Sequence, residues 1–491
     1  MHPSDRIIVI GSGIGGMTAA IVLSELGHRV TVVEKNKFPG GLMRSYTRKG
    51  MDCEVGVHYV GAMDDGQPLR QIFDLLGISG RVPFVRMGDG GVVDRYVLPD
   101  MTFDFPPGVD WFEENLHRAF PDENRQIAAV IATIRSTIER FSLSSILFGE
   151  KTEFNLSTEL QPLEGYFDKL GCSQRLHSIL SVPLAWIGVD PEECPLYLWS
   201  SSISSYLMSS WKPVNPGAHM ADTLAARLRE LGGELICDDP VLKVLIRDRV
   251  VHGVVLKSGK TLDSPVVIAA VHPKIMIRML PEDSYKPAFR NRIASLEETP
   301  GIFATHIAVP DDRVPYRPYN TFVLDDAHAL HGGVTFFTMN RSSKQGWNIV
   351  SALEESPYEK WLGWENTTKE HRPRDYREAK EHEAGILLDK AANVLGRMPG
   401  AYVVDSFTPL SFLDWMSSPE GGAYGVRRSV SQKFKTAALH RTPIEGLHLV
   451  GQSVFAPGIL GTALGTLRVL APVIGYDVLH QEFVDSGMEE I

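Results

Sequence analysis

Cysteine is scarce in this chain of 491 residues, and its four cysteines form no paired motif. Cys53, Cys172, Cys194 and Cys237 contain no C-x-x-C pair and lie too far apart for a zinc pattern. We therefore expect buried thiols in a reducing compartment and no bound metal, which favours a cytoplasmic location.

Positive charge is also in short supply, because 49 lysine and arginine residues stand against 60 aspartate and glutamate residues, a formal net charge of −11. No basic run or stripe offers a footprint for nucleic acid, so we expect no nucleic-acid partner. We expect no signal peptide, because the N-terminus leads directly into the first apolar run. The hydrophobic content of 43% is ordinary for a globular protein, and the length predicts about two domains.

Long uncharged runs are few, and residues 449–467 form one that is long enough to cross a bilayer. This segment contains several glycines, a proline, a glutamine and a serine. Such breaks favour a turn around a ligand over a membrane-spanning helix.

The strongest motif lies at the N-terminus. An apolar run over residues 6–10 is followed by Gly11-Ser-Gly13-Ile-Gly-Gly16, an alanine-containing stretch, and a second apolar run that ends at Glu34. This order predicts a strand, a tight turn, a helix and a second strand, the arrangement that binds a dinucleotide pyrophosphate at the helix N-terminus. Glu34 stands where an acid accepts ribose hydroxyls. A glycine-rich loop in an ordinary α/β unit is the alternative.

Further glycine-containing segments follow this motif. Gly40-Gly41 precedes Arg44, which is a candidate phosphate contact or else a solvated turn residue. Residues 54–61 read Glu-Val-Gly-Val-His-Tyr-Val-Gly, and residues 421–425 read Gly-Gly-Ala-Tyr-Gly. Near the C-terminus an apolar strand-like run reaches a glycine at position 451, and a predicted helix follows.

This series of motifs resembles the FAD amine-oxidase-type superfamily, and within it phytoene desaturases, carotenoid isomerases and retinol saturases. Residues 56–61 are most similar to the retinol saturase branch. The resemblance covers nearly the whole chain. It implies an FAD-dependent oxidoreductase that acts on carbon–carbon double bonds of a long apolar polyene or isoprenoid, by hydride or electron exchange at flavin N5. The family pattern often has an acid where this chain has Gln452.

The motifs and the resemblance together imply the cofactor-binding residues. These are Gly11, Ser12, Gly13, Ile14, Gly15, Gly16, Glu34, Lys35, Gly40, Gly41, Leu42, Arg44, Val57, His58, Val241, Gly451, Gln452, Gly461, Thr462 and Ala463. By the same resemblance, a helix start at Gly461 to Ala463 directs its N–H groups at the flavin, and Val241 offers its backbone to the adenine.

The catalytic candidates are His58, Tyr59 and Tyr424. His58 is the first candidate for a proton donor or orienting group, because its motif is expected to reach the flavin. A lone histidine is more often structural, and Tyr424 fits a tyrosine packed on the core as well as one bordering the flavin. The electron donor or acceptor is left open.

The fold class that follows is α/β: a Rossmann-like FAD-binding domain, with a parallel sheet plus a β-meander, and an inserted α+β substrate-binding domain. We assign 1–80, 213–275 and 431–485 to the FAD-binding domain, and 81–212 and 276–430 to the substrate-binding domain. A helix that begins near residue 122 carries an apolar face, which is either packed core or one wall of an apolar tunnel.

The stretch from Trp186 to Trp211 is rich in tryptophan, tyrosine and serine. It suggests a substrate cavity or peripheral contact with a membrane, and ordinary packing is the alternative. Two other functions fit the same scaffold: a flavin amine or amino-acid oxidase, and a non-redox prenyl- or lipid-binding protein like the Rab GDP-dissociation inhibitors. The intact glycine motif and Glu34 argue against the second.

Overall fold

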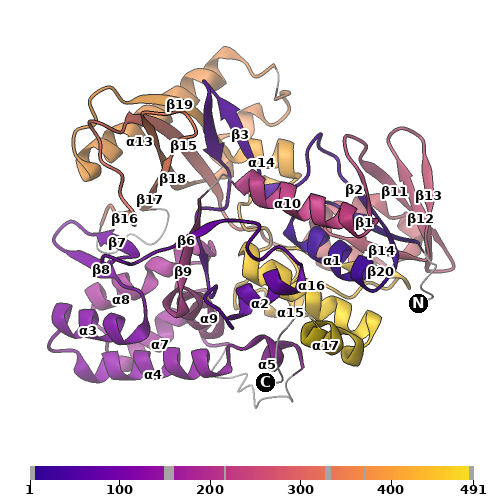
Figure 1. Ribbon diagram of the computed structural model, residues 1–491, viewed down its shortest axis with the longest axis horizontal. Coiled ribbons are helices and arrows are strands. Elements are labelled where there is room, and N and C mark those ends of the chain that lie inside the picture. Colours follow the sequence, from indigo (N-terminus) through magenta and orange to yellow (C-terminus); the bar gives the residue numbers. More distant parts are fainter. Residues whose placement is uncertain (1–5, 149–159, 215–216, 327–332, 370, 486–491) are drawn as a thin grey trace.

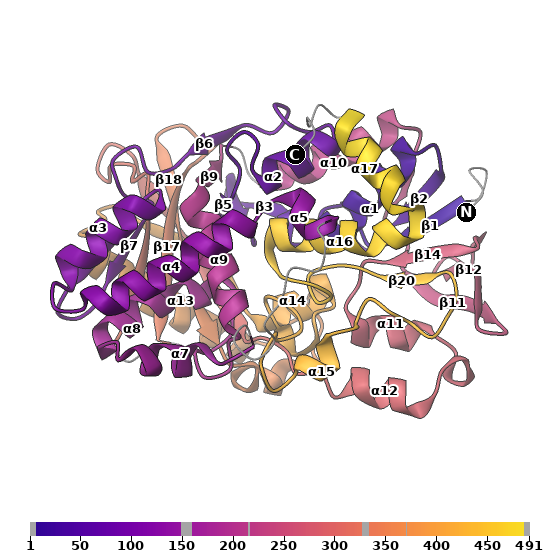
Figure 2. The same cartoon turned by 90° about the horizontal axis from the view of Figure 1, so that it is seen from below.

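The computed structural model describes residues 6–148, 160–214, 217–326, 333–369 and 371–485. Figure 1 shows two halves side by side, with the parallel sheet and a small meander at one end and a large second sheet at the other. Seen from below, helix α16 (Gly458–Ile474) lies between the halves (Figure 2).

The first half is built on a five-stranded parallel sheet in the order β10-β2-β1-β14-β20. Its strands come from three distant parts of the chain and are apolar, as expected for strands covered on both faces. They are β1 (Arg6–Ile10), β2 (Arg29–Val33), β10 (Glu234–Ile236), β14 (Val266–Ala269) and β20 (Leu447–Leu449).

Helices α1 (Ile14–Glu25) and α16 pack closely against each other beside this sheet. A Cβ atom on Gly15 would lie 3.1 Å from Thr462 Cγ2, and one on Gly16 would lie 2.0 Å from the carbonyl oxygen of Gly11. Glycine at position 16 therefore allows α1 to approach the turn after β1, and glycine at position 15 allows α1 to approach α16. The other helices of this half are α2 (Pro68–Leu75), α10 (Gly217–Glu230), α11 (Pro273–Met279), α12 (Pro287–Ala294) and α17 (Tyr476–Asp485).

The meander consists of β11 (Val241–Arg247), β12 (Val250–Leu256) and β13 (Thr261–Asp263). The sequence predicts three strands in this block, at 242–246, 250–256 and 266–270, but misses β13. The strand at 266–269 joins the parallel sheet instead, beside β1. All four of its residues are buried, which suits a central strand, whereas β13 has only its middle residue buried and forms an edge.

The second half is organised around a seven-stranded sheet in the order β19-β15-β18-β17-β16-β7-β8. Only the β16–β7 pair is parallel. Two strands precede residue 212 and five follow residue 300, so the two excursions of the chain meet in one sheet. The strands are β7 (Asp94–Val97), β8 (Thr102–Phe105), β15 (Gly301–Pro310), β16 (Asn320–Leu324), β17 (Val334–Arg341), β18 (Trp347–Ser356) and β19 (Tyr402–Phe407).

Helix α13 (Arg374–Leu395) covers one face of this sheet, and Leu387 and Ala391 pack there with Phe303 and Phe337. A group of helices forms a second core below the sheet (Figure 1). They are α3 (Val109–Ala119), α4 (Asn124–Arg140), α7 (Leu163–Leu170), α8 (Gln174–Ser181) and α9 (Leu196–Met208), whereas α5 (Leu143–Leu147) packs on the core of the first half.

The apolar face of α4 belongs to this core, since Ile127, Val130, Ile131 and Ile134 are buried among its residues. That placement favours the packed-core interpretation. Only the end of the helix, at Thr137 and Arg140, borders the cavity described below.

Short elements connect the halves. Strand β9 (Ser210–Pro213) pairs with both β5 (Val60–Gly61) and β6 (Phe84–Arg86), and the hairpin of β3 (Ser45–Arg48) and β4 (Met51–Glu54) lies against β18. Helices α14 (Pro409–Met416) and α15 (Lys433–Thr436) complete the fold. The predicted fold class is confirmed, and the domain boundaries stay a prediction. Among the helices of the described ranges, none is both long and apolar enough to pass through a membrane.

Candidate active site

Glu34 and Ser12 hold the tip of the glycine turn. The backbone N–H and the hydroxyl of Ser12 both donate to Glu34 Oε2, at 3.0 and 2.6 Å, and the Asn36 N–H donates to Oε1 at 2.8 Å. The Gly40 N–H donates to Ser12 Oγ at 3.1 Å. The buried carboxylate at the end of β2 keeps acceptor capacity on Oε1 for a ligand hydroxyl.

The start of α1 is an open anion site made of backbone. Gly13 at the N-cap makes no side-chain cap bond, and no acid lies in the first turn, so free N–H groups and the positive helix end are available. A Cβ on Gly13 would meet no atom within 4 Å, whereas one on Gly41 would lie 3.2 Å from Gly13 Cα. The glycines therefore leave a groove that phosphate groups can enter.

Arg44 lies near Glu34 and this groove. Its guanidinium carbon is 5.5 Å from the ring of Phe38 and 5.9 Å from the ring of Trp415. Its Nη1 is buried without a hydrogen-bond partner among the described residues. Burial lowers the pKa of Arg44, and the Glu34 carboxylate opposes that effect. A desolvated guanidinium with a free donor fits an anionic ligand such as a pyrophosphate.

Lys35 points elsewhere. Its Nζ donates to Ser417 Oγ at 2.6 Å and to the Asp414 carbonyl at 3.3 Å, just beyond and within α14, and burial lowers its pKa to about 8. Its role as a cofactor ligand stays a prediction. Val241 begins β11 two residues after Asp239, whose N–H donates to the Glu34 carbonyl at 3.3 Å, so its backbone lies near the ribose acid.

The C-terminal glycine motif meets the N-terminal one. A Cβ on Gly15 would lie 3.2 Å from Gly451 Cα, so the two motifs are in contact. The helix that follows begins at Gly458, and the prediction of a start at Gly461–Ala463 is wrong. Residues 451–457 fold back on α16, where a Cβ on Gly461 would lie 2.7 Å from Ala456 Cβ. The start of α16 has no side-chain cap and no acid in its first turn, which leaves a positive end.

A large cavity of about 1970 Å³ lies between the halves. It is bounded by residues 56–61 on one side and on another by residues 454–461, which follow Gly451 in the chain. Ordinary small-molecule pockets enclose roughly 300–1,000 Å³, so this one has room for a ring system and a long chain together. Its apolar wall includes Leu184, Ile187, Val189, Leu198, Leu460 and Leu464.

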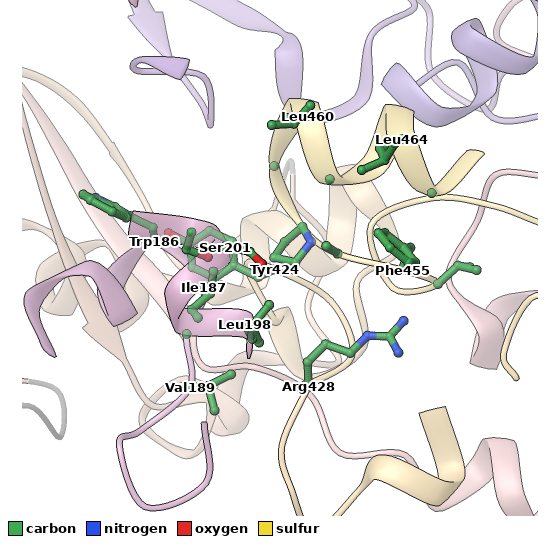
Figure 3. Close-up of a pocket in the computed structure, with 18 of the residues that line it drawn as sticks. Trp186, Ile187, Val189, Leu198, Ser201, Tyr424, Arg428, Phe455, Leu460 and Leu464 are labelled. Carbon is green, nitrogen blue, oxygen red and sulfur yellow. The ribbon is translucent and has the colours of Figure 1, made fainter. Parts of the chain in front are cut away.

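Figure 3 shows how this wall is arranged. Leu460 and Leu464 of α16 lie on one side, Trp186 lies at the opposite end from Phe455, and Tyr424 stands between them. Trp186 and Tyr206 line the cavity, whereas Trp199 is fully buried. The predicted stretch of aromatic residues thus divides between cavity wall and core.

His58 lines the cavity with both ring nitrogens buried and without a partner among the described residues. Its ring lies 5.6 Å from that of Phe336 on β17. Burial, assisted by the positive charge of His306 and Lys212, lowers the pKa of His58 to about 3. The imidazole is therefore neutral at pH 7 and presents one donor and one acceptor to a ligand.

Tyr59 belongs to a buried polar group that the sequence analysis missed. Its hydroxyl donates to Asp94 Oδ2 at 3.0 Å, and Asn320 Nδ2 donates to Asp94 Oδ1 at 2.9 Å. Burial raises the pKa of Asp94 to about 7 and lowers that of Lys212 to about 7. Lys212 Nζ donates to Thr338 Oγ1 and to a neighbouring carbonyl, each at 2.7 Å. The sequence offers no clear signal for this group, because Asp94 begins a strand in which a second charged residue, Arg95, follows it directly.

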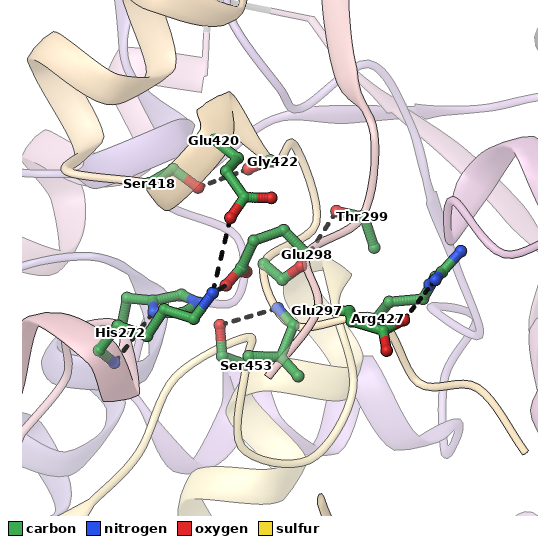
Figure 4. Close-up of polar contacts among 12 residues, drawn as sticks. His272, Glu297, Glu298, Thr299, Ser418, Glu420, Gly422, Arg427 and Ser453 are labelled. Atoms are coloured by element: carbon green, nitrogen blue, oxygen red, sulfur yellow. Dashed lines mark hydrogen bonds and ion pairs between the residues drawn. The ribbon is translucent and has the colours of Figure 1, made fainter. Parts of the chain in front are cut away.

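Tyr424 is held in place from both sides. Its hydroxyl donates to the Ala185 carbonyl at 2.9 Å, and its N–H donates to Thr299 Oγ1 at 3.0 Å. Thr299 follows Glu298, a buried carboxylate that lies 2.8 Å from both His272 Nε2 and Lys274 Nζ (Figure 4). This network joins the end of the parallel sheet to the segment that carries Tyr424.

No cluster of histidine, cysteine, aspartate and glutamate able to hold a metal occurs in the described part of the chain. The candidate site therefore consists of the glycine-lined groove at the start of α1 and the large apolar cavity, part of whose wall follows Gly451 in the chain. The neutral imidazole of His58 and the hydroxyl of Tyr59, which donates to Asp94, lie at the wall of that cavity.

Known proteins share features with this chain at the level of one domain, of the whole sequence and of the fold. A family model described as an NAD(P)-binding Rossmann-like domain matches residues 9–76. All-trans-retinol 13,14-reductase from Danio rerio is 22% identical over an alignment that covers 97% of this chain and 86% of that protein. The chloroplastic prolycopene isomerase from Daucus carota is 22% identical, with 98% of this chain and 80% of that protein covered.

Among solved structures, an oxidoreductase from Methanosarcina mazei aligns with a TM-score of 0.68 at 16% identity, covering 95% of this chain and 99% of that one. The structural likeness confirms the fold. The resemblance to retinol saturases and carotenoid isomerases is confirmed by similarity that extends along nearly the whole chain.

Proposed function

We propose that this protein is an FAD-dependent oxidoreductase that acts on carbon–carbon double bonds of a long apolar polyene or isoprenoid. The observation that carries the proposal is the apolar cavity of about 1970 Å³, which is bounded by residues 56–61 and by residues 454–461, the segment that follows Gly451. The similarity of the chain to all-trans-retinol 13,14-reductases and prolycopene isomerases also supports a carbon–carbon double bond as the site of reaction.

The residues of the groove fit FAD. Gly13 and Gly41 leave room for the pyrophosphate, Arg44 has a free buried donor for it, and Glu34 retains acceptor capacity for the ribose. The start of α16 offers a positive end to the ring, and Gly451 closes the groove beside α1. Bound FAD would supply hydride exchange at its N5.

The chain itself provides groups that hold a proton at the end of the cavity. Tyr59 donates to Asp94, whose pKa of about 7 lets this pair take up or release a proton near neutral pH. His58 remains neutral and orients a ligand through its unpartnered nitrogens. Tyr424 lines the same cavity as His58 and Tyr59. The apolar wall excludes water from the reacting carbon atoms.

The experiment uses purified protein reconstituted with FAD and incubated, in oxidised and reduced forms, with retinol and a panel of carotenoids. We expect a product that has gained or lost two hydrogen atoms or has changed a double-bond configuration. Recovery of every polyene unchanged would contradict the proposal. A parallel incubation with primary amines and amino acids tests the oxidase alternative through peroxide release.

Contact with a membrane is the further part of the proposal, because an apolar substrate has to be collected from a lipid phase. The exposed aromatic residues at the cavity rim, Phe434, Phe455 and Tyr476, supply the contact in this account. Flotation with liposomes tests it: Phe434→Asp should reduce the floating fraction, and Val85→Asp, an exposed apolar residue away from the cavity, should not. Complete recovery of the wild-type protein in the soluble fraction would refute it.

A further inference from the structure

The cavity is apolar along most of its wall, but basic side chains gather at one end of it. Arg428, His440, Arg441 and Arg468 all line this end, beside Phe455. The chain as a whole has a formal net charge of −11, so the cluster runs against the overall charge. Figure 3 shows Arg428 reaching toward Phe455, on the side of Tyr424 away from Trp186.

Arg428 is the buried member of this cluster, with 9% of its surface exposed. Its Nη1 donates to the Thr436 carbonyl at 3.2 Å and its Nη2 to the Ser453 carbonyl at 2.8 Å. Its Nε is buried and has no partner among the described residues. A guanidinium has five N–H donors, so three remain for a ligand. Burial lowers the pKa of Arg428 to about 10, which leaves it charged at pH 7.

The residues of this cluster form no ion pair with a carboxylate among the described residues, and no carboxylate acts on the pKa of Arg428. The charges that act on His440 are all positive, from Arg441, Arg468 and Arg428, and together with burial they lower its pKa. Within the described ranges we find no ion pair formed by the three arginines, and Arg468 instead lies over the ring of Phe455 at 5.1 Å. The cavity also borders on Asp190, Glu354, Glu355 and Glu445. Of these, Glu354 is paired with Lys390 at 3.2 Å.

A desolvated charge without a partner is costly in a folded protein, and an anionic ligand removes that cost. Arg441 and Arg468 are exposed at the rim and steer an anion inward, whereas Arg428 can bind it out of water. Bilayer head groups reach the rim but not the buried guanidinium, so the partner that fits is a single amphiphile inside the cavity.

We infer that the natural substrate is an amphiphile whose unsaturated chain lies along the apolar wall toward Trp186 and whose anionic head, a carboxylate or a phosphate, binds Arg428. The inference rests on the proposed function and narrows its substrate class. A neutral carotenoid or a free alcohol would leave the arginine cluster unpaired.

The test measures binding of matched probes to the FAD-loaded protein. All-trans-retinoic acid is compared with its methyl ester, and geranylgeranyl diphosphate with geranylgeraniol, by quenching of tryptophan fluorescence. We expect at least one anionic probe to bind tenfold or more tightly than its neutral partner, and the difference to shrink as salt is added. The pair with the larger ratio tells a carboxylate head from a phosphate head.

Variants locate the head group. Arg428→Gln should reduce the preference for the anionic probe at least tenfold and leave the affinity for the neutral probe within about twofold. Arg427→Gln is the matched control, because Arg427 pairs with Glu297 and does not line the cavity (Figure 4). If Arg428→Gln does not fold, Arg441→Gln combined with Arg468→Gln at the exposed rim should weaken the preference several-fold.

Equal binding of charged and neutral probes, binding of neither, or an unchanged preference in Arg428→Gln would overturn the inference. Binding and turnover separate the two proposals. Conversion of neutral polyenes without any head-group preference would refute only the inference. A strong anionic preference without conversion of any polyene would refute only the proposed function.

Discussion

Gly13→Ala separates the cofactor role of the glycine turn from its structural role. Gly13 has φ −64° and ψ 175°, a conformation open to any residue, and a Cβ there would meet no protein atom within 4 Å. The variant should therefore fold, and its free energy of unfolding without cofactor should rise by about 0.4–1 kcal/mol because the unfolded chain loses freedom. This corresponds to about 0.4–1 °C in Tm for a chain of this size.

The same methyl group fills the groove that our account assigns to the pyrophosphate. Overpacking by a methyl group costs about 1–3 kcal/mol, so the Kd for FAD should rise roughly 5- to 150-fold. FAD titration followed by flavin fluorescence measures this, with thermal unfolding of the cofactor-free protein as the folding check. Gly165→Ala in α7, also with open space at its Cβ, is the control and should bind FAD normally. Unchanged FAD affinity in a folded Gly13→Ala protein would refute the assignment of the groove.

Three other predictions address the surrounding groups. Arg44→Gln removes a buried donor that has no acceptor in the described part of the protein. Loss of a hydrogen bond to a charged group costs about 1.5–3 kcal/mol, so the Kd for FAD should rise roughly 10- to 150-fold. A Kd within twofold of wild type would exclude Arg44 as a phosphate ligand. His58→Phe should lower turnover about 10²-fold at nearly constant Tm, because the ring nitrogens serve no other protein group, and full activity would remove His58 from the mechanism. Asp94 keeps its proton up to pH about 7 in the folded protein but loses it near its usual pKa of 3.8 in the unfolded chain. Its contribution to the free energy of unfolding therefore falls as pH rises between these two values. Asp94→Asn should make the free energy of unfolding, measured with urea, depend less steeply on pH, and an unchanged dependence would contradict the raised pKa.

Local patterns made much of the fold predictable. The glycine spacing and the apolar runs that end at Glu34 act within short stretches of the chain. Strands expected from the sequence at 320–324 and 402–407 occur as β16 and β19. Helical spacing of apolar residues likewise predicts α4, and the helix expected over about 375–395 occurs as α13, because each packs one continuous apolar face.

The remainder depends on contacts between distant segments. Asp94 meets Asn320 only because β7 and β16 pair, and Lys212 joins them from β9. Arg428 and Arg468 come from a loop and a helix that no local rule brings together. The early start of α16 reflects tertiary packing as well, since residues 451–457 fold back onto glycines of that helix.

The most direct measurement of the central claim is product analysis after anaerobic mixing of the FAD-loaded protein, oxidised or reduced, with a polyene. Our account predicts that the protein binds FAD and that, in at least one redox state, a carbon–carbon double bond of the polyene is gained, lost or isomerised. A preparation that cannot be loaded with FAD, or a loaded protein that leaves every polyene unchanged in both redox states, would contradict it.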